Sequence, residues 1–103
     1  MEVSIVHIGA RAHPERAVRV AARADGQAIN VTLDQDVIQQ LCGNASDDEQ
    51  MLLALTRNQE ALRIAIAAYV SARGVPLDEQ FLLSWRDFSE ANRGLVMARG
   101  TGR

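Results

Sequence analysis

The stretch RVAARADGQAINVTL, from Arg19 to Leu33, predicts a β-hairpin that turns at Asp25 and Gly26. A two-residue primed turn needs a positive φ at both central positions, and Asp-Gly meets that requirement. Counting outward from the turn gives the cross-strand pairs Ala24–Gln27, Arg23–Ala28, Ala22–Ile29, Ala21–Asn30, Val20–Val31, Arg19–Thr32 and Val18–Leu33. One face of this hairpin is apolar and the other is mixed, so a slip of one residue would expose the apolar side chains. The turn and the periodicity therefore predict the same register.

The rest of the chain predicts one strand before the hairpin and a helix-rich segment after it. Val3–Ile8 is rich in β-branched residues and is followed by Gly9 and the turn segment AHPE, residues 12–15. After Leu33 the apolar spacing becomes helical, and a further strand-like alternation comes late in the chain. The predicted elements are a short helix over Asp34–Cys42, a capping box at Ser46–Glu49, a long helix over Asp47–Arg73, a fourth strand over Gln80–Phe88 and a short helical turn, capped by Asp87 with Glu90, that ends at Gly94.

These elements favour an α+β fold with two layers. An antiparallel sheet, with the chain order β-β-β-α-α-β, is covered on one face by the long helix. We expect a single domain over residues 1–88 and a C-terminal extension over residues 89–103, with a short helical turn and then a frayed tail. At about 1.5 Å per residue the long helix measures roughly 40 Å, about twice the length of a six-residue strand. The helix must overhang the sheet, bend near Asn58 or pack on something else.

The long helix carries two stripes of side chains. The larger stripe is apolar and suits the sheet; it comprises Met51, Leu52, Leu55, Leu62, Ile66, Tyr69 and Val70. The second stripe is of alanines, and small side chains at this spacing let another helix approach closely. With its neighbours it predicts a protein interface made of Leu53, Ala54, Ala61, Ile64, Ala65, Ala68 and Ala72. If this is a homodimer seam, Ala65→Glu should split the dimer and leave a folded monomer. The alternative is that alanine is simply the best helix former.

Composition and charge argue against several classes of protein. The 103 residues are 48% hydrophobic and carry a formal net charge of −2. All eleven basic residues are Arg, and residues 34–56 hold five acids and no base. This balance lacks the basic field that dominates nucleic-acid affinity. The start of the chain resembles neither a signal peptide nor an anchor, and no apolar run reaches the roughly 20 residues of a membrane helix, so we expect a cytoplasmic protein.

The pattern of elements resembles a family of small proteobacterial proteins known as domain of unknown function 1488. The resemblance covers Arg16 to Phe88 and rests on the Asp25-Gly26 hairpin, the short helix near Val37–Leu41, the helix ALRIAIAAYVSARG (Ala61–Gly74) and the late strand closing on Asp87-Phe88. It implies a compact α+β bacterial domain and supplies no catalytic residue, cofactor or substrate. The tail after Phe88 is longer than that family would have and lies outside the resemblance.

Few residues suggest catalysis or metal binding. Cys42 lies in the last turn of a predicted helix, where the helix dipole disfavours a thiolate, so a thiol enzyme using His7 or His13 is the least favoured hypothesis. One cysteine and two histidines also make a poor structural zinc site. The acids of SDDE stand at a helix start, where capping accounts for them without a bound cation. We therefore predict no enzymatic activity, no cofactor and no metal.

The mixed face of the hairpin is a second candidate surface. Arg16, Arg19 and Arg23 lie on or beside it among small side chains, which suits an anion or a protein partner. A nucleic-acid reader on an open sheet would normally offer aromatic side chains, and this face has none. The alternative is a solvated sheet face. We predict a non-enzymatic interaction domain, acting as a homodimer or an adaptor, with a weak nucleic-acid-binding regulatory protein as the alternative.

Overall fold

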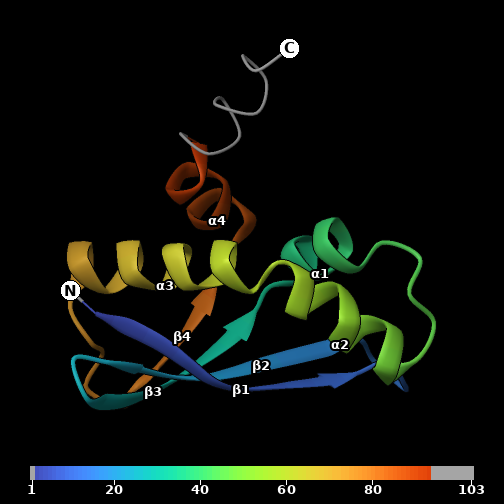
Figure 1. Cartoon of the computed structure of the whole chain (residues 1–103), viewed down its shortest axis with the longest axis horizontal. Coiled ribbons are helices and arrows are strands. Elements are labelled where there is room, and N and C mark those ends of the chain that lie inside the picture. Colours follow the sequence, from blue (N-terminus) through green and yellow to red (C-terminus); the bar gives the residue numbers. More distant parts are fainter. Residues whose placement is uncertain (1, 94–103) are drawn as a thin grey trace.

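The computed structural model describes residues 2–93, which form a four-stranded sheet with four helices on one side of it (Figure 1). Along the chain the elements are β1 (Val3–Arg11), β2 (Ala17–Ala24), β3 (Gln27–Leu33), α1 (Gln35–Cys42), α2 (Asp48–Arg57), α3 (Gln59–Arg73), β4 (Gln80–Leu83) and α4 (Trp85–Ala91). This arrangement confirms the α+β class.

The predicted hairpin is confirmed in both turn and register. Asp25 and Gly26 have φ values of 50° and 87°, as a primed two-residue turn requires. The pairs run from Ala24–Gln27 to Arg19–Thr32 as counted from the sequence. The apolar face of the hairpin is buried under the helices, and the mixed face is not covered by them. The sheet therefore has one core face and one open face.

The sheet is mixed, so the prediction of a wholly antiparallel sheet is wrong. The strand order is β1-β2-β3-β4, and β4 pairs with β3 in the parallel direction, with Val31 opposite Phe81 and Leu33 opposite Leu83. The physical reason is the connection: α1, α2 and α3 carry the chain over the sheet and back, so β4 enters in the direction of β3. Phe81 and Leu83 complete the core side of the sheet.

The segment predicted as one long helix is two helices. α2 ends at Arg57 and α3 begins at Gln59, with Asn58 between them at φ −103° and ψ 16°. The Asn58 side-chain amide donates to the carbonyl oxygen of Ala54 at 2.8 Å, a local bond that competes with continuing the helix. The bend near Asn58 was one of the three expected answers to the length mismatch. It lets both helices bury apolar side chains against the sheet; these are Met51, Leu55, Leu62, Ile66 and Val70.

The predicted cap of α2 needs correction. α2 is capped by Asp47 rather than Ser46: the Asp47 carboxylate accepts from the backbone N–H of Gln50 at 2.8 Å. Gln50, in place of Glu49, reaches back: its side-chain oxygen accepts from the N–H of Ser46, the residue before the cap. The aspartate displaces the serine because its side chain also accepts well at an N-cap and stands closer to the helix.

The fourth strand is shorter than predicted, and the chain turns into α4 from Trp85. The Ser84 hydroxyl accepts from the Asp87 N–H at 3.1 Å, so Ser84 caps this helix in place of Asp87. Helical spacing then stacks Trp85 on Phe88, with ring centroids 5.2 Å apart. α4 spans the domain boundary predicted at Phe88. The predicted helix end at Gly94 and the predicted frayed tail lie outside the described residues.

Candidate interaction surfaces

The alanine stripe of α3 faces α4 of the same chain. Asn92, just after α4, donates from Nδ2 to the carbonyl oxygen of Ala61 at 3.1 Å. Further along α3, a hollow of about 300 Å³ lies between Ala68 and Ala72 on one side and α4 on the other. The small side chains do admit a second helix, as the spacing suggests. That helix belongs to the chain itself.

The seven residues predicted as an interface do not share one exposed surface. Ala65 is 1% exposed, and Ala54, Ala61 and Ile64 are half-buried. Exposure is left to Leu53, on α2, and to Ala68 and Ala72, near the end of α3. The expectation that Ala65→Glu leaves a folded monomer is wrong, because it would bury a carboxylate in the core.

Arg16 does not point onto the open sheet face, contrary to its predicted place in an anion-binding set. Its guanidinium donates to the carbonyl oxygens of Gly43 at 3.0 Å and Ala45 at 3.3 Å, and to the Gln39 side chain at 3.3 Å. These acceptors lie at the C-terminal end of α1 and just beyond it. Unpaired carbonyls and the negative end of the helix dipole attract a cation there. Arg16 is therefore a structural clamp between the β1–β2 connection and the end of α1.

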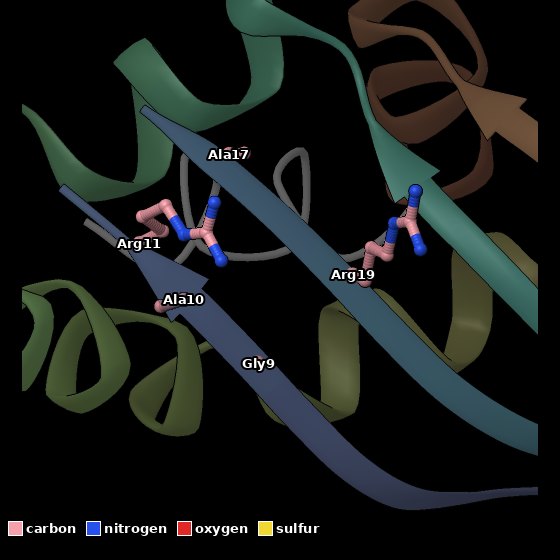
Figure 2. A pocket seen from close by; sticks show the side chains of 5 residues that line it. All are labelled: Gly9, Ala10, Arg11, Ala17 and Arg19. Atoms are coloured by element: carbon pink, nitrogen blue, oxygen red, sulfur yellow. The ribbon is translucent and has the colours of Figure 1, made fainter. Parts of the chain in front are cut away.

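The open sheet face carries Arg19 and Arg23, as predicted, and also Arg11. Figure 2 shows Arg11 and Arg19 on the same side of the sheet, beside a shallow hollow of about 460 Å³ with Gly9 and Ala17 in its wall. Within residues 2–93 the ion pairs involve other arginines, Arg63, Arg73 and Arg86. Arg11 was missed because the first strand was expected to end near Ile8.

The thiol and imidazole side chains that could carry chemistry each have different surroundings. The Cys42 thiol is buried and donates to the carbonyl oxygen of Met51 at 4.0 Å. Burial raises the pKa of this thiol, and the nearby Arg16 charge offsets part of the rise. His13 Nε2 is 3.2 Å from the Ser46 carbonyl oxygen, and His7 is exposed on β1. Among the described residues no group of His, Cys, Asp or Glu could hold a metal ion.

The free edge of β1 is a surface that the sequence did not reveal. In the described part of the chain β1 pairs with β2 on one side only, which leaves its outer edge without a strand. A hollow of about 260 Å³ lies along Ile5–Ile8, between this edge and α2 residues including Leu52. Val6 is 60% exposed and Leu52 is 41% exposed. β1 is irregular at this point: between Ile5 and His7, Val6 is an extra residue that has no partner on β2.

Comparison with protein-family models, with curated proteins and with solved structures found no match to this chain. The resemblance to domain of unknown function 1488 stays a prediction from the sequence. Within residues 2–93 none of the helices has the length and apolar character needed to span a membrane.

Proposed function

We propose that this chain is a cytoplasmic, non-enzymatic protein-interaction domain that forms a homodimer, with the free edge of β1 as its contact surface. The observation that carries the proposal is the edge itself. A strand edge presents unpaired N–H and C=O groups that bind a further strand, and natural proteins usually protect such edges with charges or short strands. β1 is nine residues long and has no Asp, Glu, Lys or Arg from Val3 to Ala10.

The exposed apolar side chains near this edge support the same surface. Val6 and Leu52 border the hollow beside β1, and the next residue on α2, Leu53, is 52% exposed. Large apolar side chains that gather beside an unpaired strand gain free energy when a partner removes them from water. Elsewhere on the described surface, Leu77 and Leu82 are exposed without a long free strand beside them.

The open face favours one alternative, a weak nucleic-acid-binding role. Arg11 and Arg19 flank a hollow, and Arg23 lies farther along β2, so three arginines share a face that none of the helices within residues 2–93 covers. Guanidinium groups bind phosphates well, and such binding falls steeply with salt. Aromatic side chains that could stack on bases lie on the other side of the sheet. Tyr69 stacks on Phe81 between the helices and the sheet, with ring centroids 3.8 Å apart.

Light scattering over a concentration series, at low and high salt and with and without added nucleic acid, tests the proposal. We expect a mass of twice 11.3 kDa that survives high salt, because main-chain bonds and apolar contacts hold the edge. Val6→Lys should weaken this dimer. Its matched control is Leu82→Lys, an exposed apolar residue on β4, at the opposite edge of the sheet. A monomer that gains mass only with nucleic acid at low salt would favour the alternative instead.

A further inference from the structure

We infer that two copies pair through their β1 strands, antiparallel, with Ile5 of one copy opposite Ile8 of the second copy. This inference rests on the proposed function and gives it a partner and a register. It follows from the irregular spacing of the backbone groups on the outer edge of β1 and from the charges at its two ends.

The first step is to find which backbone groups face away from β2. The carbonyl oxygen of Glu2 accepts from the Asp25 N–H at 2.8 Å, so Glu2 faces the hairpin. Backbone direction alternates along a strand, so Val3 and Ile5 face outward. Beyond the extra residue Val6, His7 is opposite Ala21 and faces β2, and the outward positions become Ile8 and Ala10.

The far end of the strand agrees with this assignment. The next outward position after Ala10 is Ala12, and its N–H donates to the Asp48 carboxylate at 2.6 Å rather than to β2. Asp48, at the start of α2, thereby occupies the edge beyond Ala10. The part of the edge that a second strand can use therefore runs from Val3 to Ala10.

The outward groups are spaced unevenly, and this spacing selects the partner. Val3 and Ile5 are two residues apart, Ile5 and Ile8 are three apart, and Ile8 and Ala10 are two apart. A regular strand offers the same direction every two residues and falls out of step at the irregularity. The spacing two, three, two reads the same in both directions. A second β1, running antiparallel, therefore matches it, with Val3 opposite Ala10 and Ile5 opposite Ile8 at both ends.

Charge supports the same register. The twofold axis falls between Val6 and His7, and extending the pairing outward places Glu2 opposite Arg11 of the second copy. Both residues are exposed, and the alternation of side chains along β1 places both on the open face of the sheet. Each dimer therefore contains two opposite-charge pairs, one at either end of the paired strands, and opposite charges across neighbouring strands are favourable. A shift of two residues would lose both pairs.

Charge reversal tests the register with substitutions that leave the fold alone. Glu2 bonds the hairpin through its backbone N–H and C=O, so Glu2→Arg keeps those contacts, and Arg11→Glu alters an exposed side chain. Each single variant faces a like charge at both ends and should dimerise about tenfold more weakly at low salt. A mixture of the two variants restores both opposite pairs. Native mass spectrometry of the mixture should show the heterodimer in excess of either homodimer, and the double reversal should dimerise like the original chain. Arg23→Glu, on the same face but on β2, one strand in from the β1 edge, is the matched control and should leave dimerisation unchanged.

The outcomes separate the register from the proposed function. If the original chain dimerises and the two single reversals dimerise equally well, the register is overturned and the homodimer stands. If the original chain is a monomer at every concentration, the homodimer of the proposed function fails, whatever the variants do. Circular dichroism of each variant confirms that the fold is retained.

Discussion

Replacing Arg16 by alanine should destabilise the monomer, because Arg16 ties together segments far apart in the chain. Its guanidinium donates to the carbonyl oxygens of Gly43 and Ala45, both in partly buried surroundings. Its own carbonyl oxygen accepts from the side chain of Gln35 at 2.6 Å, at the other end of α1. The substitution removes the guanidinium bonds and leaves the carbonyls near the C-terminal end of α1 without that donor.

The size of the effect follows from the type of bond. A hydrogen bond from a charged donor contributes about 1.5–3 kcal/mol to the free energy of unfolding. Three contacts do not add fully here, since the bond to Gln39 is exposed and the buried Nε of Arg16 has no partner among the described residues. We expect a loss of about 2 kcal/mol, which lowers Tm by roughly 10 °C for a domain of this size. Arg16→Lys should lose about half as much, because one ammonium group has no planar fork to reach both carbonyls.

Urea denaturation followed by circular dichroism measures this loss. Arg19→Ala is the matched control, because Arg19 lies on β2, is exposed, and its side chain has no hydrogen-bond or ion-pair partner within residues 2–93. We expect the control to change the free energy of unfolding by less than about 0.5 kcal/mol. Equal, small losses for Arg16→Ala and Arg19→Ala would refute the structural role of Arg16.

Three further predictions test other parts of the structure. Ala65→Glu should lower the free energy of unfolding by about 4 kcal/mol or more and unfold much of the protein, whereas Ala68→Glu, at an exposed position on the same helix, should be tolerated. If the thermal melts of the two variants coincide, the buried position of Ala65 is contradicted. Asp47→Ala should cost about 1 kcal/mol through loss of the α2 cap, and an unchanged urea midpoint would argue against that cap. Burial raises the pKa of the Cys42 thiol above its ordinary value of 9.0. The thiol therefore loses its proton at a higher pH in the folded state than in the unfolded state, and the free energy of unfolding falls as the pH rises above about 9. Cys42→Ala should remove that part of the pH dependence, and identical slopes with and without the thiol would contradict it.

The hairpin and α1 were predictable because local signals agree there. Asp25-Gly26 sets the turn, and the apolar alternation sets the face, so only one register satisfies both. Asp34 and Gly43 likewise bound α1 by ordinary cap chemistry. In each case the residues that decide the structure are close together in the sequence.

The remaining features depend on contacts between distant segments. The direction of β4 is set by the route of the chain through three helices, which no residue within β4 encodes. In the sequence Arg16 is indistinguishable from the other arginines near the hairpin. Its structural role depends on the fold, which brings the Gly43 carbonyl oxygen at the end of α1 within hydrogen-bond distance. The extra residue Val6 has no signature in a run of β-branched residues, and it appears only when Ile5 and His7 are matched to β2. The β1 edge was therefore outside what periodicity could find.

Amide hydrogen exchange along β1, measured residue by residue with NMR, tests the β1–β1 pairing most directly. His7 and Gly9 face β2, so their amides should be protected in monomer and dimer alike. The outward amides of Ile5 and Ile8 should exchange quickly in dilute monomer and become protected as the dimer forms. A dimer in which the amides of Ile5 and Ile8 still exchange as fast as in the monomer would contradict the pairing.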